Sequence, residues 1–319
     1  MLLGGRVPLT PAVATARPRE DDRGMKIGIT GASGLIGTPL VPLLRADGHE
    51  VVRFVRGVAS GDDERGWDPG ARRLDPADLA DLDAVVHLAG AGVADKRWSE
   101  SWKRTVLDSR VDGTTAVATA MALAQGPKVL LSASAIGWYG DTGDRITDET
   151  GPSGKGYLAD VCRQWETATA PADAAGIRVA HLRTGIVLSG QGGALAKQVP
   201  IFKAFLGAPL GSGRQWTSWI SLRDELAAIR HCLTADVSGP VNLVGPAPVT
   251  NRDFTRALGR AVHRPTLPVP IPGFVLKAVL GQFAEEGVLV GQRLQSSVLQ
   301  RTGFTFADPD IDSALASSL

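Results

Sequence analysis

Three glycines at three-residue intervals are the residues of this sequence with the clearest chemistry. Gly31, Gly34 and Gly37 follow a short β-branched stretch (26–30) and open an apolar helical stretch (38–44). Gly31 permits a tight turn, Gly34 lets the backbone approach a pyrophosphate, and Gly37 allows close helix packing. Free backbone amides and the positive end of the helix dipole then hold the phosphates. The pattern predicts a dinucleotide-binding turn.

The end of the next predicted strand indicates which dinucleotide binds. An NAD site usually carries an acidic residue there, about twenty residues past the glycines, which bonds the ribose 2′-hydroxyl. Here the stretch 50–55 is followed by Arg56, with no carboxylate at the strand end. A guanidinium pairs with a 2′-phosphate through charge-assisted hydrogen bonds, although a solvated surface arginine is the alternative. We therefore predict NADP(H). Besides the glycines, the turn and strand residues expected to contact it are Ser33, Leu35, Ile36, Val55 and Arg56.

Size and composition argue against several other classes of protein. The chain has 319 residues and a net charge of +1, which gives no electrostatic argument for nucleic-acid or membrane binding. Two cysteines make no disulfide framework, and no apolar run is long enough to span a bilayer. The histidines are dispersed, so no metal site is expected. These features favour a cytoplasmic protein with a small-molecule substrate, and they leave its oligomeric state undefined.

Alternating strands and helices are expected to position these residues. Strands are predicted at 26–30, 50–55, 84–90, 128–132 and 178–183, with at most a further short strand near Trp67. The helices predicted between them cover 38–44, 99–125 and 157–175. This alternation is typical of a Rossmann-type α/β fold, a doubly wound parallel sheet with right-handed crossovers.

The chain divides into three predicted parts. Residues 1–24 are rich in Pro, Arg and Ala without periodicity, so we expect a disordered N-terminal extension. Residues 25–187 should form the NADP-binding Rossmann domain, whose sheet later segments can complete. Residues 188–319 should form a smaller substrate-binding lobe at the carboxyl edge of the sheet, where open α/β folds bind ligands. The elements expected in this part are helices at 194–205, 222–234 and 251–262, an extended link at 265–272 and a short strand at 304–306.

Three motifs resemble the extended short-chain dehydrogenases/reductases. They are TGASGLIG (30–37), HLAGA (87–91) and SASAIGWYG (132–140). Further segments at 95–98, 211–216 and 291–293 resemble, more narrowly, the atypical epimerase-like branch of the NAD(P)-dependent epimerase/dehydratase type, which carries a C-terminal domain of unknown function. The resemblance implies an NADP-dependent oxidoreductase or epimerase that acts on a small hydroxyl, carbonyl or nucleotide-sugar-like substrate.

The resemblance also shows that a catalytic pair is missing. Typical members carry Tyr-x-x-x-Lys on the helix after the serine strand, where the tyrosine exchanges a proton with substrate and the lysine lowers the tyrosine pKa. In this chain Trp165 and Glu166 set the register, which places Leu158 and Cys162 at those positions. Two interpretations stay open: an enzyme with substitute groups, or a catalytically silent NADPH-binding regulator or partner-binding module.

Ser134 and Tyr139 are the catalytic residues predicted in place of the missing pair. Ser134 matches the active-site serine of the family and orients a substrate oxygen, or else it only ends a strand. Tyr139 or a bound water supplies the proton, unless Tyr139 is a buried tyrosine bonded to a backbone carbonyl. Tyr157 and Cys162 are expected to pack rather than react.

The resemblance extends the predicted contacts along the chain. Arg110 stands where related enzymes carry an asparagine and reaches the cofactor, unless it forms only a surface salt bridge. The other expected cofactor contacts are Leu88, Ala89, Gly90, Gly185 and Val187. From the second lobe, Arg214, Trp216 and Trp219 are expected to bind an anionic or planar substrate, with structural packing as the alternative for the two tryptophans.

Overall fold

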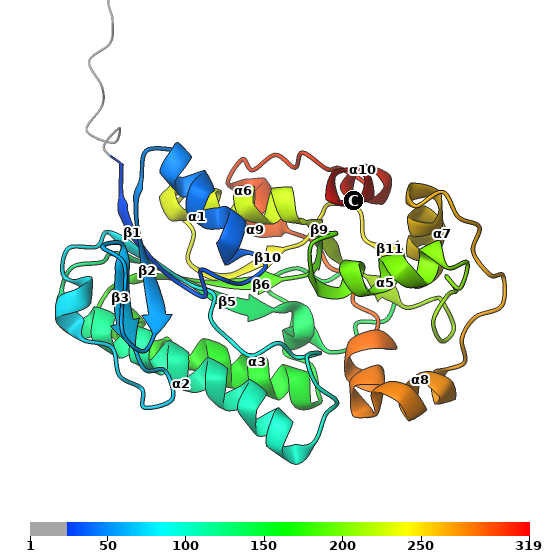
Figure 1. The fold of residues 1–319 in the computed structure, drawn as a ribbon, viewed down its shortest axis with the longest axis horizontal. Helices are drawn as coiled ribbons and strands as arrows, with labels where there is room; N and C mark the ends of the chain where they lie inside the picture. The colour runs from blue at the N-terminus through cyan, green and yellow to red at the C-terminus, as the bar shows by residue number, and fades with distance from the viewer. Residues whose placement is uncertain (1–23) are drawn as a thin grey trace, which may run out of the picture.

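Seven parallel strands form the central sheet of the computed structural model, which describes residues 24–319 (Figure 1). In spatial order they are β10 (Gly239–Leu243), β6 (Arg178–Thr184), β5 (Val129–Ala135), β4 (Ala84–His87), β1 (Lys26–Thr30), β2 (Glu50–Arg56) and β3 (Glu64–Trp67). The order reverses between β1 and β4, the topological switch point at which such folds bind ligands. The Rossmann-type fold predicted from the sequence is confirmed. The predicted disordered extension (1–24) lies outside the described residues, apart from Gly24.

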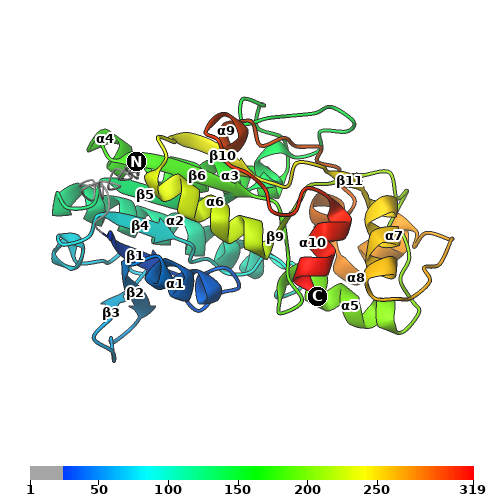
Figure 2. The same cartoon turned by 90° about the horizontal axis from the view of Figure 1, so that it is seen from above.

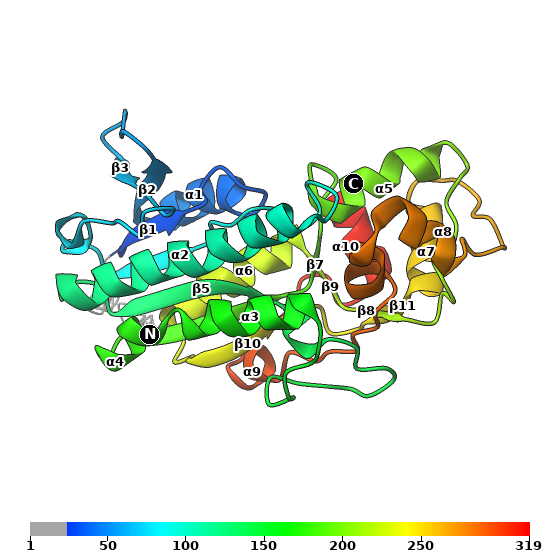
Figure 3. The same cartoon turned by 90° about the horizontal axis from the view of Figure 1, so that it is seen from below.

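Helices cover both faces of this sheet, as Figures 1 and 3 show. One face carries α1 (Gly37–Ala46) and α6 (Leu222–Thr234), and the other carries α2 (Glu100–Ala124), α3 (Tyr157–Thr167) and α4 (Ala170–Ala174). Side chains alternate along each strand, so that Leu131 packs in the core beneath α1 and α6 whereas Leu130 packs beneath α2. The strands β2, β4, β5 and β6 therefore contribute to both hydrophobic cores.

The structure differs from two of the predicted elements. The helix expected at 157–175 is divided into α3 and α4, because Pro171 has no backbone N–H to continue a helix and lies in the first turn of α4. The strand expected at 304–306 is absent. Its alternating apolar residues, Phe304 and Phe306, instead pack edge to face, with ring centroids 4.9 Å apart, against the core beneath α6.

A smaller lobe lies beyond one end of the sheet, where Figure 2 shows its helices side by side. Its helices are α5 (Gly193–Lys203), α7 (Asn251–Ala261), α8 (Gly273–Leu280) and α10 (Ile311–Ser318). Two short strand pairs accompany them: β7 (Ile186–Leu188) with β9 (Trp219–Ser221), and β8 (Trp216–Thr217) with β11 (Val249–Thr250). The remaining short elements are α9 (Ser297–Arg301) and the helical turns Pro76–Leu79, Ile136–Tyr139 and Ala284–Val288.

The chain returns to the sheet after it enters this lobe. Both α6 and β10 come from the part predicted as the lobe (188–319), yet they complete one face and one edge of the central sheet. None of the helices in residues 24–319 combines the length and apolar composition that a membrane crossing requires.

A carboxyl group is buried between α6 and the sheet. Glu225 is 1% exposed, and its Oε1 accepts a hydrogen bond of 3.0 Å from the Thr184 hydroxyl at the end of β6. Its Oε2 has no partner among the residues described. Burial raises the pKa of Glu225 to about 8, so the group is neutral over most of the physiological range.

This burial predicts that the protein loses stability as the pH rises. In the unfolded chain Glu225 ionises above its ordinary pKa of 4.5, whereas in the folded protein it keeps its proton until the pH reaches about 8. The free energy of unfolding should therefore fall through this interval. Glu225→Gln should raise it by about 2–4 kcal/mol at pH 8.5 and change it little at pH 4, as measured by urea unfolding. Glu100→Gln, on the exposed surface of α2, is the control. An equal effect of Glu225→Gln at both pH values would contradict the burial of a neutral carboxyl.

Candidate functional site

The glycine turn between β1 and α1 is held in close contact with the chain that follows β4. Gly31 has a φ of +70°, and a Cβ there would lie 2.8 Å from the amide nitrogen of Ala89. A Cβ at Gly37 would overlap the carbonyl oxygen of Gly31, so α1 begins directly against the turn. A Cβ at Gly34 would meet only that same oxygen, at 3.2 Å, and otherwise face open space. Gly31 thus permits the contact with the chain after β4, Gly37 permits the close start of α1, and Gly34 leaves the front of the turn open.

Unpaired amides line the open side of this turn. Among the described residues, the amides of Ser33, Leu35 and Ile36 have no backbone hydrogen-bond partner. No side chain caps the N-terminus of α1, and its first turn carries no acidic residue. Donors at the positive end of a helix dipole, with only a hydrogen atom at Gly34 in front of them, fit the pyrophosphate of a dinucleotide.

A buried Thr–His–Thr chain fixes the neighbouring loop. The Thr30 hydroxyl accepts hydrogen bonds from the amides of Leu88 (3.2 Å) and Ala89 (3.3 Å) and lies 2.7 Å from Nδ1 of His87. The other ring nitrogen of His87 is 3.0 Å from the Thr114 hydroxyl. Burial lowers the pKa of His87 to about 4, so the imidazole is neutral. The predicted contacts Leu88 and Ala89 are thereby held beside the glycine turn.

The side chain of Arg110, on α2, forms a hydrogen bond with the same loop. Its guanidinium donates hydrogen bonds to the carbonyl oxygens of Ala91 (2.8 Å) and Val106 (3.0 Å) and lies 4.8 Å from the ring centre of Trp165. Burial lowers its pKa, and it forms no salt bridge within the described part of the chain. A Cβ at Gly90 would lie 3.5 Å from the guanidinium carbon. Arg110 is therefore adjacent to the predicted cofactor loop, and the surface salt bridge considered as an alternative is absent.

Arg56 lies at the carboxyl end of β2 with its side chain exposed. No described residue forms a hydrogen bond or ion pair with it. Arg53, on the same strand, donates two hydrogen bonds to Asp63 and is 3.1 Å from Glu64. Of the two arginines of β2, Arg56 alone keeps its donors free for a ligand, and Val55 precedes it, half-buried.

The two predicted catalytic hydroxyls belong to one buried network. Ser134 donates a hydrogen bond of 2.7 Å to Glu166, which forms two hydrogen bonds with Arg183 (2.8 and 2.9 Å). The Tyr139 hydroxyl donates to Asn242 (2.7 Å) and accepts from Arg183 (3.0 Å). Each of the five side chains is at most 9% exposed, and burial raises the pKa of Tyr139. The structure brings Ser134 and Tyr139 together, but with each hydroxyl already paired.

The two residues of α3 that were expected to pack do so. The Tyr157 hydroxyl donates to the carbonyl oxygen of Lys103, and burial raises its pKa to about 12. The Cys162 thiol contacts the carbonyl oxygen of Ala135 at 3.5 Å, and burial raises its pKa to about 12 as well. Neither group is poised to give up a proton near neutral pH.

The lobe caps α3, which the sequence did not predict. Glu286, in the helical turn Ala284–Val288, accepts a hydrogen bond of 2.9 Å from the amide of Leu158 in the first turn of α3. A Cβ at Gly156 would lie 3.0 Å from the same carboxylate, and Gly156 has a φ of +103°. Because the contact joins residues 128 positions apart, no local pattern could reveal it.

Gly185 and Val187 join the sheet to the lobe. The amide of Gly185 donates to Leu243 of β10, and a Cβ at Gly185 would lie 2.8 Å from the carbonyl oxygen of Ser218. Val187 pairs with Ile220 in the β7–β9 ladder. Both residues therefore lie where the chain leaves the carboxyl edge of the sheet.

The three predicted substrate contacts lie in different surroundings. Trp219 is 1% exposed in the lobe core, and its indole donates to Ala247. Trp216 is half-buried, with its indole N–H 2.7 Å from Asp144. Arg214 is exposed. This arrangement favours the packing role for Trp219 and leaves Arg214 as the accessible cation.

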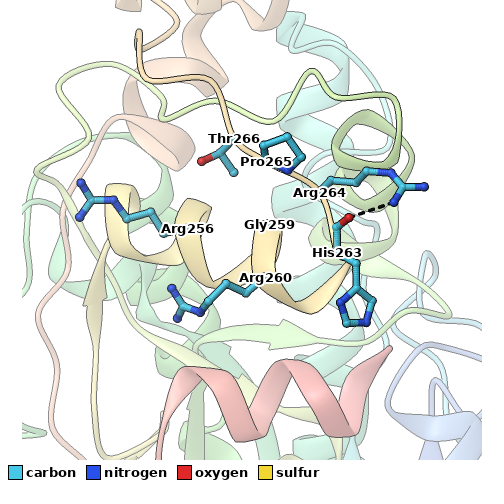
Figure 4. Close-up of a pocket in the computed structure, with 7 residues that line it drawn as sticks. All are labelled: Arg256, Gly259, Arg260, His263, Arg264, Pro265 and Thr266. Carbon is cyan, nitrogen blue, oxygen red and sulfur yellow. Dashed lines mark hydrogen bonds between the residues drawn. The ribbon is translucent and has the colours of Figure 1, made fainter.

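A pocket of about 540 Å³ lies on the outer side of α7, away from these residues (Figure 4). In this view the side chains of Arg256 and Arg260 extend to the left, whereas that of Arg264 extends to the right. Arg260 pairs with Asp312 at 2.6 Å. None of the predicted site residues lines this pocket. Within residues 24–319, no cluster of three or more His, Cys, Asp or Glu side chains could hold a metal ion.

Comparison with known proteins identifies the family. Residues 27–245 match the model of the NAD dependent epimerase/dehydratase family, and residues 271–318 match a domain of unknown function, DUF1731. The chain belongs to the NAD dependent epimerase/dehydratase family. An epimerase family protein of Mycobacterium tuberculosis (MT2273) is 49% identical over 290 residues, which cover 91% of this chain and 96% of that protein.

Two solved structures extend the likeness of this epimerase family member to three dimensions. The human epimerase family protein SDR39U1, crystallised with NADPH, has a TM-score of 0.83 at 32% identity, covering 92% of this chain and 99% of that one. A nucleoside-diphosphate sugar epimerase of Corynebacterium glutamicum has a TM-score of 0.78 at 36% identity. That match covers 94% of this chain but only 59% of the Corynebacterium chain.

The different roles of the turn glycines predict different stability losses. Gly31→Ala places a side chain at a positive φ, 2.8 Å from a backbone nitrogen, and should lower the free energy of unfolding by about 2–3 kcal/mol. Gly34→Ala meets only one oxygen at 3.2 Å and should cost about 1 kcal/mol or less. Urea unfolding of both variants without nucleotide measures the difference. Equal losses would contradict the assignment of Gly31 as the sterically restricted position.

Proposed function

We propose that this protein is an NADP-dependent oxidoreductase or epimerase of the extended short-chain dehydrogenase/reductase type. Its substrate is a small hydroxyl or carbonyl compound, or one resembling a nucleotide sugar. The observation that carries the proposal is the set of unpaired amides at Ser33, Leu35 and Ile36, combined with the free guanidinium of Arg56. The human relative crystallised with NADPH supports the choice of cofactor.

Different residues of the chain would bind different groups of the cofactor. The turn amides hold the pyrophosphate, and Arg56 pairs with the 2′-phosphate. The loop of Leu88, Ala89 and Gly90, fixed by Thr30, lies beside the turn and would contact the cofactor there. Bound NADP(H) supplies hydride exchange at its nicotinamide ring, and the protein contributes position and electrostatics.

Ser134 and Tyr139 are the groups proposed to handle the substrate oxygen and its proton. Ser134 directs its hydrogen to Glu166, which leaves its oxygen able to accept a hydrogen bond from a substrate hydroxyl. Tyr139 donates to Asn242, so it must exchange that partner for the substrate before it can transfer a proton. Otherwise a bound water fills this role. Arg214, the exposed cation among the three predicted substrate contacts, is proposed to pair with an anionic group of the substrate.

A second candidate function follows from the same network. Leu158 and Cys162 replace the usual Tyr and Lys, and the hydroxyls of Tyr139 and Tyr157 are both hydrogen-bonded within the protein. This arrangement also suits a catalytically silent protein that binds NADPH and signals its presence to a partner. The two candidates share the cofactor site and differ in whether hydride is transferred.

Cofactor preference is the first quantity to measure. Titration followed by nicotinamide fluorescence should show NADPH binding at least tenfold tighter than NADH. Arg56→Ala should weaken NADPH binding about tenfold or more, since it removes charge-assisted hydrogen bonds to the 2′-phosphate, and leave NADH within twofold. Arg104→Ala, which removes an exposed arginine of α2, is the matched control. Equal binding of both nucleotides by the wild type would overturn the NADP assignment.

Hydride transfer then separates the two candidate functions. The enzyme hypothesis predicts oxidation of NADPH, or epimerisation with bound cofactor, for at least one member of a panel of nucleotide sugars, aldehydes and ketones. For that substrate Tyr139→Phe should lower kcat at least tenfold without changing NADPH affinity, because only the hydroxyl is lost. A protein that binds NADPH tightly yet transfers hydride to no panel member would favour the silent module.

A further inference from the structure

A pocket of about 590 Å³ opens at the carboxyl ends of β2 and β3. Arg56 and Gly57 line it from β2, and Trp67 lines it from the end of β3. The opposite wall is the segment that follows β3, which contributes Asp68 and Arg73. Two arginines from different segments thus line one pocket beside the strand end that was predicted to hold a 2′-phosphate.

A short hairpin fixes the position of the second arginine. The amide of Asp68 donates to the carbonyl oxygen of Arg73 (2.9 Å), and the amide of Arg73 donates back to Asp68 (2.8 Å). The Asp68 carboxylate accepts a further bond from the amide of Ala71 at 3.1 Å, which closes the turn. Arg72 has a φ of +52° and directs its guanidinium to Asp112 of α2, at 2.7 Å. The hairpin is held by these bonds of Asp68, and the two adjacent arginines differ in their surroundings: the Arg72 side chain pairs with Asp112, and Arg73 lines the pocket.

Among the described residues, neither acidic residue of the pocket forms a hydrogen bond with the Arg73 side chain. Asp68 forms an ion pair with Arg73, at 3.7 Å between its carboxylate oxygen and the guanidinium, which is beyond hydrogen-bond distance. Both side chains are exposed, so this pair is weak and a phosphate can replace it. Asp75 directs its carboxylate to the amide of Ala77, at the start of the helical turn Pro76–Leu79. The side chain of Arg73 is 79% exposed, so its donors are open to a ligand.

We propose that Arg73 is a specificity-determining residue that binds the 2′-phosphate of NADP(H) together with Arg56. The inference rests on the proposed function, because it concerns the same cofactor. A phosphate monoester has three acceptor oxygens and close to two negative charges, more than one guanidinium can pair. The hairpin fixes the backbone of Arg73 before the ligand arrives, so binding has to order only its side chain. NADH has a 2′-hydroxyl at this position and gains nothing from the second arginine.

The test compares two adjacent arginines of the same hairpin. NADPH and NADH are titrated against the wild type, Arg73→Ala, Arg73→Lys and Arg72→Ala. Arg73→Ala should weaken NADPH binding about tenfold and leave NADH within twofold. Arg73→Lys should recover part of the loss, because it keeps the charge without the planar guanidinium. Arg72→Ala removes the same charge from a side chain paired with Asp112, and should change NADPH binding less than twofold. Competition by adenosine 2′,5′-bisphosphate should follow the NADPH pattern.

The outcomes distinguish failure of this inference from failure of the proposed function. If the wild type prefers NADPH and Arg56→Ala abolishes the preference while Arg73→Ala retains it, Arg73 is only a surface arginine. Equal losses for Arg72→Ala and Arg73→Ala, or equal losses for NADPH and NADH, would likewise overturn the inference. A wild type without preference for NADPH would overturn the proposed cofactor itself.

Discussion

The close approach between the glycine turn and the chain after β4 is the constraint on which the site depends. Only a residue without a Cβ allows the backbone at position 31 to lie against Ala89, and Thr30 then bridges the two segments through one hydroxyl. His87 lies 2.7 Å from this hydroxyl and is neutral, so it adds no charge next to the proposed phosphate site. At the switch point between β1 and β4, the two segments are thus in direct backbone contact beside the proposed cofactor site.

The ion pair between Glu166 and Arg183 has a second organising role. Removing both charges from water is costly. The hydrogen bonds that Glu166 and Arg183 form with each other and with the two hydroxyls offset this cost. Through it, the hydroxyls of Ser134 and Tyr139 are held at the end of β5, beside Asn242 of β10. The same bonds that fix these hydroxyls compete with any substrate, which is why one network supports both an enzymatic and a silent interpretation.

Local patterns in the sequence predicted the sheet, the glycine turn and the exposed end of β2. Each depends on neighbouring residues: alternation of apolar positions, glycine spacing, or the absence of an acid beside Arg56. Contacts between distant segments could not be predicted in this way. Asn242 reaches Tyr139 across 103 positions, and Glu286 caps α3 across 128 positions from Leu158, so neither partner is visible in a single sequence. Phe304 and Phe306 show that a local pattern can also mislead. Their apolar side chains alternate as in a strand, but no strand forms there, and the alternation reflects the packing of the two rings.

The lobe contacts the sheet domain at both the cofactor turn and α3, and this limits how substrate specificity can arise. A Cβ at Gly192, just before α5, would lie 2.9 Å from the Leu35 side chain, so the lobe packs directly on the turn. Glu286 occupies the amide of Leu158, where the usual catalytic tyrosine would stand. Under the proposed function, the sheet domain sets the chemistry and the cofactor preference, and residues such as Arg214 on the lobe set the choice of substrate.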